Sequence, residues 1–404
     1  MRAVVVGSGG REHALAHALS RTAEVFVTPG NPGIPGSVPT PPEELEADLF
    51  VIGPEQPLVD GLADRLRARG ALVFGPGADG AQLEGSKAWM KQLLVDAGVP
   101  TAAHGTFTDA DSAVAFLRTL DGLYVVKTDG LAAGKGVLVT TDLAEAESDV
   151  RDKLSGSAFG AAGRTVVIEE GMSGPEVSLL CLTDGHRIVA LPAAQDFKRV
   201  GDGDLGPNTG GMGAYSPLPF VDARLVDAVV ANCVEPTLAE LRRRGIDYRG
   251  VLYAGLMLTP NGPKVLEYNA RFGDPETQVV LPRLLGDVAG LLAEAASGAL
   301  RTDPQVSSDA AVTVVCASEG YPTSPRYGDA ISGIEAAGAI DGVTVYCAGV
   351  GRSPDGSLVT AGGRVLTVTG TGSTIAAARD RAYAGVAQIN WPGMVVRHDI
   401  AAGR

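Results

Sequence analysis

The sequence predicts a multidomain α/β protein that begins with an open parallel sheet and continues into α+β units. Short apolar strands alternate with helical segments over the first hundred residues, as they do in a parallel sheet covered by helices. The chain has 404 residues, which is too long for one ordinary core. Its composition, 45% hydrophobic and 20% charged, is typical of a globular protein.

The N-terminal sheet is expected to contain four strands, each followed by a turn rich in glycine or proline. We place these strands at residues 2–6, 25–28, 49–52 and 72–74. Because ligands bind beyond the carboxyl ends of parallel strands, the turns are candidate binding loops. A helix over residues 86–97 ends at Gly98-Val99-Pro100, which is a helix-end signal. The first domain is therefore expected to span residues 1–100.

Three further units are expected after this domain. Residues 101–190 form a compact α+β unit, with helices at 110–120 and 143–154 and strands at 124–127, 137–139, 165–170 and 176–182. Residues 191–306 hold a polar glycine-rich loop, a long helix at 221–244 and strands at 251–258 and 264–268. Residues 307–404 alternate strands and turns, and a closing helix begins near Ser373. We interpret this last part as a separate α+β domain.

Composition and charge argue against several classes of protein. With 33 basic and 47 acidic residues the net charge is −14, and no sustained basic run is present to follow a nucleic acid. No run of about 18 apolar residues predicts a membrane span, and the first apolar run is too short for a signal peptide. The four cysteines form no CxxC pair, so buried thiols are expected rather than disulfides. These features predict a cytoplasmic protein without nucleic acid or membrane partners.

The segment PKVLEYNARFGDPET, residues 263–277, is the strongest chemical signal. A strand there places Glu267 and Asn269 on one face, because side chains two apart in a strand point the same way. Arg271, Asp274 and Glu276 follow in a Gly-Pro turn. A carboxylate, an amide oxygen and a guanidinium at this spacing suit Mg²⁺ that itself holds phosphates. The plainer interpretation is a solvated strand end with an Asp-Pro turn.

A glycine loop follows the expected strand at 124–127. Lys127 lies at the strand end, and Gly134, Lys135 and Gly136 lie in the loop, where backbone N–H groups and lysine charge suit phosphate oxygens. The spacing is not that of a P-loop, and a flexible hairpin is the alternative. Further on, Glu169 and Glu170 end a strand that can face an adenine edge, and Glu176 can accept bonds from ribose hydroxyls. Taken alone, this acidic hairpin is a weak signal.

Two other loops carry polar residues. The loop from Gln195 to Pro217 contains GPNTGGMGAYSP and predicts a mobile lid over a ligand, with a disordered linker as the alternative. Its candidate binding residues are Asp196, Lys198, Asn208, Thr209, Gly210 and Gly211. The first turn fails as a dinucleotide site, because Glu12 stands at the third glycine position. It leaves a helix N-terminus and Arg11, suited to a single phosphate. His13 and His17 are expected to form a packed helix face.

Taken together, these motifs resemble the glycinamide ribonucleotide synthetase (phosphoribosylamine–glycine ligase) family of ATP-grasp enzymes. The matching segments occur in family order: GSGGREHALA, PGN, GPEQPLVDG, FGP, QLEGSKA, DGLAAGKGV, GPNTGGMGAYSP, LYAGLM, RFGDPE and GGRVL. The resemblance implies an N-terminal pre-ATP-grasp sheet, a two-lobed ATP-grasp core and a small C-terminal α+β domain. It also implies a monomer or weak homodimer.

The resemblance implies a reaction and a role for each residue. ATP, with Mg²⁺ or Mn²⁺, activates glycine as an acyl phosphate, which the amine of 5-phosphoribosylamine attacks. Glu267 and Asn269 would hold the metal, Arg271 would stabilise the transferred phosphoryl group, and Asp274 would hold the glycine ammonium. The remaining roles follow in the same way: phosphates at Lys87, Lys127 and Lys135; adenine and ribose at Glu169, Glu170 and Glu176; phosphoribosylamine at Gly9, Gly10, Arg11, Asn31 and Lys198.

Three departures from the family pattern stand out. The segment between PGN and GPEQP is short, which puts the second βα unit in question. Phe197 replaces a common histidine, so that position cannot serve acid–base chemistry. The strand at 251–258 has no acid for a second metal ligand. The alternatives are another ATP-grasp ligase, a nicotinamide-dependent oxidoreductase and a non-catalytic ATP-binding regulator.

Overall fold

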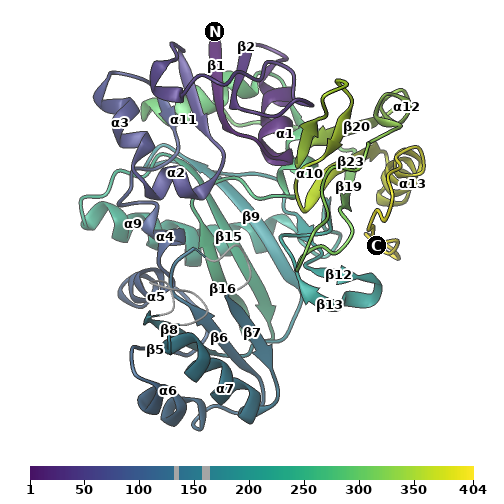
Figure 1. The fold of residues 1–404 in the computed structure, drawn as a ribbon. Coiled ribbons are helices and arrows are strands. Elements are labelled where there is room, and N and C mark those ends of the chain that lie inside the picture. The colour runs from purple at the N-terminus through teal and green to yellow at the C-terminus, as the bar shows by residue number, and fades with distance from the viewer. Residues whose placement is uncertain (132–135, 157–163) are drawn as a thin grey trace.

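The computed structural model describes residues 1–131, 136–156 and 164–404. Three segments surround the central strands β9 (Glu176–Thr183), β15 (Gly250–Thr259) and β16 (Gly262–Asn269). Figure 1 shows the N-terminal segment at the top, the segment around residues 104–170 at the bottom and the C-terminal segment at the right. Within the described residues, no helix has the length and apolar character needed to cross a membrane.

The N-terminal sheet is parallel throughout, as the strand–turn–helix pattern predicts. Its order is β2-β1-β3-β4, built from β1 (Arg2–Gly7), β2 (Glu24–Pro29), β3 (Leu49–Ile52) and β4 (Val73–Phe74). Helices α1 (Gly10–Leu19), α2 (Glu55–Val59) and α3 (Leu62–Ala68) follow the first and third strands. The buried Val and Leu side chains of β1 and β3 form the cores on its two faces.

The shortened segment after β2 contains no α-helix over residues 30–48, all of which are described, and only the 3-10 turn Pro42–Glu44. It folds back along β2 instead. The Val27 N–H donates to Gly36 O at 2.9 Å, and the Val38 N–H donates to Val27 O at 2.9 Å. The second βα unit is therefore replaced by a loop that uses the free edge of β2, which would otherwise expose unpaired backbone groups.

The small lobe is an antiparallel sheet with two helices on one face. Its order is β5-β8-β6-β7, from β5 (His104–Phe107), β6 (Tyr124–Thr128), β7 (Val137–Thr140) and β8 (Val166–Glu170). Helices α6 (Ala110–Leu117) and α7 (Leu143–Leu154) bury Val114, Leu117 and Val150 against it. Asp109 and Asp142 cap the two helix N-termini through their side chains.

The central sheet is antiparallel, in the order β10-β9-β15-β16, with β10 at Ile188–Ala190. Helices α4 (Gln82–Gly85), α5 (Lys87–Asp96) and α11 (Val288–Ser297) pack near it. The prediction of a single helix at 221–244 is wrong in detail. The structure has α8 (Ala223–Val229), a π turn (Val230–Val234) and α9 (Glu235–Arg243). Pro236 is the second residue of α9, and because proline lacks an N–H and crowds the preceding turn, the helix widens there.

The C-terminal segment shares its sheet with the glycine-rich loop. The order is β11-β14-β19-β23-β20, from β11 (Gln195–Asp196), β14 (Gly213–Ser216), β19 (Ala310–Ala317), β20 (Val343–Cys347) and β23 (Arg364–Gly372). Helices α12 (Ile334–Gly338) and α13 (Ile375–Val386) complete it. Strands from both sides of residue 306 therefore form one sheet, which places the loop of residues 197–212 beside the C-terminal segment.

Part of the loop predicted to be a lid forms a hairpin that contacts the C-terminal segment. Strands β12 (Arg199–Gly201) and β13 (Leu205–Asn208) pair with each other and project beside the C-terminus in Figure 1. Buried Arg397 contacts Asp204 Oδ1 at 2.7 Å, and the His398 N–H donates to Asp202 at 2.7 Å. The Phe197 ring lies 5.0 Å from the Arg397 guanidinium. Phe197 therefore helps to anchor the hairpin.

Contacts between α1 and β20 join the two ends of the chain. The His13 Nδ1 accepts a hydrogen bond from the Cys347 N–H at 2.8 Å, and its ring meets Tyr346 edge-on at 5.5 Å. Asn31 donates to the carbonyls of Cys347 and Ala348. Burial lowers the pKa of His13 to about 4, with a smaller contribution from the charge of His17. All four cysteines are buried free thiols, as expected.

We predict that His13 makes the stability of the protein depend on pH. Because the pKa of His13 is lower in the folded state than its ordinary 6.5, its contribution is fully present above pH 6.5 and is lost as the pH falls toward 4. The loss is at most about 3 kcal/mol. Urea unfolding of His13→Asn, whose amide oxygen can still accept the Cys347 bond, should show a flatter profile between these pH values. His186→Asn, at an exposed turn, is the control; an identical profile in wild type and His13→Asn would contradict the assignment.

Candidate active site

One large cavity, of about 810 Å³, lies where the small lobe, the central sheet and the two ends of the chain meet. The lining includes residues from the first turn (Arg11), from α2 and α4, from the strands of the small lobe, from the end of β16, and from the C-terminal segment (Tyr321 and Arg364). A single hollow thus brings together side chains that are more than 350 residues apart in the sequence.

The end of the cavity between the lobes is apolar. Val125, Val137 and Val139 of the small-lobe sheet line one side, and Leu256, Met257 and Leu266 of the central sheet line the other. Met172, in the connection between β8 and β9, also lines this end. Aliphatic walls on two sides form a slot that suits a flat, largely apolar ring.

A buried ion-pair cluster forms the floor beside this slot. The Glu169 carboxylate contacts Lys127 Nζ at 2.7 Å and Lys91 Nζ at 2.9 Å. Burial acts to raise the pKa of Glu169, but the charges of Lys127 and Lys91 outweigh it and hold that pKa below its usual value. Sequence reasoning missed Lys91. The available signal was its position one helical turn after Lys87 in KAWMK, which alone is typical of any amphipathic helix.

Lys87 lies at the N-terminus of α5 and has a different environment. Its Nζ donates to the Gly130 carbonyl at 2.8 Å, and no carboxylate in the described part of the chain forms an ion pair with it. Burial lowers its pKa, while the nearby charge of Glu267 opposes that effect. Lys87 thus presents a cavity-facing positive charge available to an anion.

Other predicted nucleotide residues lie along the cavity wall. Glu170 accepts from the Ala103 N–H and from Lys264 Nζ, both at 3.0 Å, which ties the small lobe to β16. Lys198 is held by Asp196 at 3.0 Å and by Glu176. All of these except Ala103 and Lys264 line the cavity. Gly136 also lines it, whereas Gly134 and Lys135 lie outside the described residues.

The end of β16 presents two side chains to the cavity whose oxygens can act as metal ligands. Glu267 pairs with Gly255 of β15, and a bulge places Val265 opposite Leu256, so Leu266 is the extra residue. Tyr268 points the other way, with its hydroxyl donating to Cys233 O at 2.9 Å. The Glu267 carboxylate makes no hydrogen bond or ion pair with any residue that the structure describes. Its oxygens are therefore available to a cation.

Asn269 and the glycine opposite Glu267 complete this arrangement. Among the described residues, the Asn269 amide oxygen accepts a hydrogen bond only from Arg271, and that bond is long, at 3.4 Å. At Gly255 a Cβ would lie 3.2 Å from Glu267 Cγ, so the small residue leaves room for the carboxylate. A carboxylate and an amide oxygen on one strand face fit a hard divalent cation. Groups of three or more acidic, histidine or cysteine ligands are absent from the described residues, so further ligands would come from substrate and water.

Arg271 is held by two carboxylates that sequence reasoning did not predict. Its Nε contacts Glu55 of α2 at 3.1 Å, and its Nη2 contacts Glu84 of α4 at 2.7 Å. Burial acts to lower the pKa of Arg271, but Glu84 and Glu55 outweigh it and raise that pKa above its usual value. Burial in turn raises the pKa of Glu84 to about 7, despite the Arg271 charge. Both acids stand in motifs, GPEQP and QLEGSKA, whose partners only the tertiary structure reveals.

A side chain of α1 binds back to the first turn, which precedes that helix. Glu12 accepts a hydrogen bond from the Gly9 N–H at 2.6 Å and contacts Arg11 Nε at 2.5 Å. Arg11 also donates to the Phe272 carbonyl at 3.3 Å and lines the cavity. The Asn31 side chain is bonded to Ser8 O and to the C-terminal segment. The structure thus brings Arg11 to the cavity but places Gly9, Gly10 and Asn31 outside its lining.

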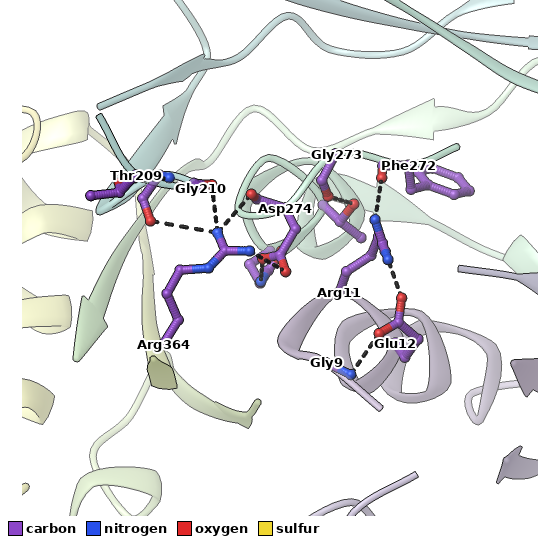
Figure 2. Close-up of polar contacts among 12 residues, drawn as sticks. Gly9, Arg11, Glu12, Thr209, Gly210, Phe272, Gly273, Asp274 and Arg364 are labelled. Carbon is purple, nitrogen blue, oxygen red and sulfur yellow. Dashed lines mark hydrogen bonds and ion pairs between the residues drawn. The ribbon is translucent and has the colours of Figure 1, made fainter. Parts of the chain in front are cut away.

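The turn after Arg271 lies between the two ends of the chain. Asp274 is bound by Arg364 Nη2 at 2.9 Å and accepts from Gln278 Nε2 at 2.7 Å. Figure 2 shows Asp274 and Arg364 pointing toward each other, beside Gly210. Glu276 accepts from the Tyr253 hydroxyl at 2.6 Å. Asp274, Glu276 and Arg364 line the cavity, and sequence reasoning missed Arg364 although it quoted GGRVL.

The glycine-rich loop packs directly on this turn. The Thr209 hydroxyl donates to Lys198 O at 2.8 Å, and the Gly210 N–H donates to the Tyr321 hydroxyl at 3.1 Å. Gly211 has a φ of +107°, and a Cβ there would lie 2.5 Å from Pro275 Cδ. Only glycine fits this approach. Asn208, Thr209 and Gly210 line the cavity, whereas Gly211 supports it from behind.

Comparison with known families matches almost the whole chain. Three models of phosphoribosylglycinamide synthetase match in order: the N domain over residues 1–84, the ATP-grasp (A) domain over residues 85–277 and the C domain over residues 311–403. This chain belongs to the phosphoribosylglycinamide synthetase family. The membership confirms the resemblance drawn from the motifs, and it confirms the expected fold class.

Individual relatives agree with the family models. The chain is 49% identical to a phosphoribosylamine–glycine ligase of Streptomyces coelicolor, covering 100% of this chain and 99% of the relative. It is 45% identical to one from Brucella melitensis, with 99% and 97% covered. Among solved structures, the Thermotoga maritima phosphoribosylamine–glycine ligase superposes with a TM-score of 0.86 at 34% identity, covering 99% of this chain and 100% of that one.

A more distant structural likeness concerns the fold alone. The biotin carboxylase domain of the Hydrogenobacter thermophilus 2-oxoglutarate carboxylase superposes with a TM-score of 0.74 at 15% identity, covering 98% of this chain and 91% of that one. That protein is named for a carboxylase, so a shared fold does not by itself identify the reaction. The motif sequence and the full-length relatives separate this chain from it.

We predict that Glu169 is essential for stability. Glu169→Gln would leave Lys91 and Lys127 buried without their counter-charge, and breaking such a buried pair typically costs about 3–5 kcal/mol. Urea unfolding should report a loss of that size. Glu170→Gln is the matched control. The Glu170 carboxylate pairs with Lys264 at a partly exposed position, so a loss of about 1 kcal/mol or less is expected. Equal losses in the two variants would contradict the role given to the cluster.

Proposed function

We propose that this protein joins glycine to 5-phosphoribosylamine with consumption of ATP, yielding glycinamide ribonucleotide, ADP and phosphate in purine biosynthesis. The observation that supports it best is that one cavity unites motifs from all three family domains, GREHALA, RFGDPE and GGRVL, in a chain that its ligase relatives match from end to end. The enzyme uses ATP with Mg²⁺ or Mn²⁺.

The apolar slot between the lobes is the proposed site for the adenine ring. Lys87 and Lys127 face the same cavity, close enough to neutralise a polyphosphate that extends from the slot. Glu170 and Glu176, on the wall, are the proposed hydrogen-bond partners of the adenine and ribose, and Glu169 contributes by holding Lys127 in place. Glu267 and Asn269 would hold the divalent cation, which when bound neutralises phosphate charge.

The chemistry proceeds in two steps through the proposed glycyl phosphate. A carboxylate oxygen of glycine attacks the γ-phosphorus, the bond from that phosphorus to the β–γ bridging oxygen breaks, and ADP leaves. The phosphoribosylamine nitrogen then attacks the acyl carbon, the carbon–oxygen bond to phosphate breaks, and the nitrogen loses one proton. Arg271, held by Glu55 and Glu84, is placed to stabilise the negative charge on the transferred group.

The acceptor and glycine would lie toward the ends of the chain. Asp274 is the proposed partner of the glycine ammonium, since its carboxylate lines the cavity and is kept ionised by Arg364. Arg11 and Lys198 are the proposed contacts of phosphoribosylamine. Gly9, Gly10 and Asn31 would shape the turn that presents Arg11, because their own backbone and side-chain bonds stay within the protein.

Several broader properties belong to the same proposal. We propose a cytoplasmic enzyme, which the four buried free thiols support. We propose a monomer or weak homodimer, to be checked by light scattering across protein concentration. We also propose that the chain works as four units, residues 1–100, 101–190, 191–306 and 307–404, with one sheet joining the last two.

The decisive experiment measures phosphate release from Mg·ATP with glycine, with and without freshly generated phosphoribosylamine. Release that requires both substrates, with glycinamide ribonucleotide formed in equal amount, supports the proposal. Release with another carboxylate in place of glycine would move the specificity while keeping the ligase chemistry. Absence of release with every substrate pair would contradict catalysis and favour a non-catalytic ATP-binding protein.

We predict that Glu267→Ala lowers turnover by about a thousandfold. The variant would lose several kcal/mol of metal-dependent stabilisation of the reacting phosphates. Steady-state assays should show this loss across a titration of Mg²⁺ or Mn²⁺. Glu147→Ala, on the surface of the small lobe where it pairs with Arg118, is the matched control and should keep wild-type turnover. Near-normal turnover in Glu267→Ala would exclude the metal assignment.

A further inference from the structure

The turn from Arg271 to Glu276 is contacted by arginines from both ends of the chain. From the N-terminal domain, Arg11 donates to the Phe272 carbonyl at 3.3 Å. From the C-terminal domain, Arg364 reaches Asp274 at 2.9 Å. Figure 2 shows the two arginines on opposite sides of the turn. The turn that carries the proposed glycine ligand is therefore positioned by both ends of the chain.

Arg364 is bonded to two active-site loops at once. Its Nη1 donates to the Gly210 carbonyl at 2.6 Å and to the Asp274 carbonyl at 2.8 Å, while its Nη2 contacts Asp274 Oδ2. A Cβ on Gly210 would lie 3.1 Å from the Arg364 guanidinium carbon, so the loop backbone approaches as closely as a glycine allows. A planar guanidinium with several fixed donors is suited to such a bridge.

The backbone of Arg364 is held in a strand that has a neighbour on each side. The residue begins β23, which lies between β19 and β20 in the five-stranded sheet. Groups held by packed strands keep their geometry better than groups on loops. The C-terminal sheet thereby positions the Arg364 guanidinium, and the guanidinium in turn positions Asp274.

The second oxygen of Asp274 is oriented by the other side of the site. Gln278, which is fully buried, donates to Asp274 Oδ1 at 2.7 Å. Its amide lies against the first turn, because a Cβ on Gly10 would be 2.9 Å from Gln278 Nε2. Burial acts to raise the pKa of Asp274, but the charges of Arg364 and Arg11 outweigh it and keep that pKa below its usual value. The carboxylate is thus ionised and held by both oxygens.

We propose that Arg364 is a positioning residue for glycine binding: it fixes the Asp274 carboxylate against the Gly210 loop, so that the C-terminal domain sets the affinity for glycine. This inference rests on the proposed function, in which Asp274 binds the glycine ammonium. Arg364 acts through Asp274, and its removal leaves the slot and the lysines of the nucleotide end in place.

The test uses the full-length enzyme with Arg364→Met, Arg364→Lys, Asp274→Asn and the double variant Arg364→Met/Asp274→Asn. Loss of a charge-assisted bond predicts a rise of about 10- to 100-fold in the KM for glycine in Arg364→Met, with the KM for ATP within about twofold of wild type. Arg364→Lys keeps a charge near Asp274 but cannot hold both loops, so its KM for glycine should fall between those of wild type and Arg364→Met. The double variant should match Asp274→Asn alone, because both changes remove one function.

Arg379→Met is the matched control. Arg379 lies in the same domain and donates to the carbonyls of His398 and Ile400, away from the cavity. An unchanged KM for glycine in Arg364→Met, a rise of the same size in Arg379→Met, or additive effects in the double variant would overturn the inference. A wild-type enzyme whose phosphate release does not depend on glycine would instead overturn the proposed function, and this result is visible before any variant is compared.

Discussion

The pairing of opposite charges across domain boundaries is the constraint on which the rest of the structure depends. Arg271 of the ATP-grasp core takes Glu55 and Glu84 from helices that precede it by about 190–220 residues, as their numbering shows. Arg364 of the C-terminal domain takes Asp274. Each of these groups is largely shielded from water, where a lone charge is costly and a paired one is tolerated. The domains therefore dock in the arrangement that satisfies the charges, and that arrangement is also the one that closes the cavity.

The same pairing supports the divalent cation that we propose at this site. In the described part of the cavity wall, carboxylates outnumber cations, and most of the cations already have carboxylate partners. Lys87 is an exception, with only a carbonyl partner at 2.8 Å. A polyphosphate that entered such a wall would meet net repulsion from groups such as Glu267. Glu267 and Asn269 would hold the proposed cation, and its charge would offset that repulsion.

The local features of this protein could be predicted from its sequence, whereas its long-range pairings could not. The parallel strands follow from short apolar runs that alternate with helical segments, and the shared face of Glu267 and Asn269 follows from the period of two in a strand. Both are local properties of the sequence. The partners of Arg271 and Arg364 lie far away in the sequence, and no local pattern marks them. At the first turn, a local contact was not predicted from the sequence. Its N–H groups look free in the sequence, but Glu12 of the same helix folds back to bind the Gly9 N–H.

The segment after β2, residues 30–48, contacts the C-terminal domain and does not line the cavity. Its backbone pairs with Val27 along the edge of β2, and Asn31 at its start binds the carbonyls of Cys347 and Ala348. No described residue between 30 and 48 lines the cavity. This region therefore contributes contacts to the C-terminal domain, and none of its described residues lines the cavity. Because β20 pairs with β23, whose first residue is Arg364, the Asn31 bonds tie this segment to the sheet that carries Arg364.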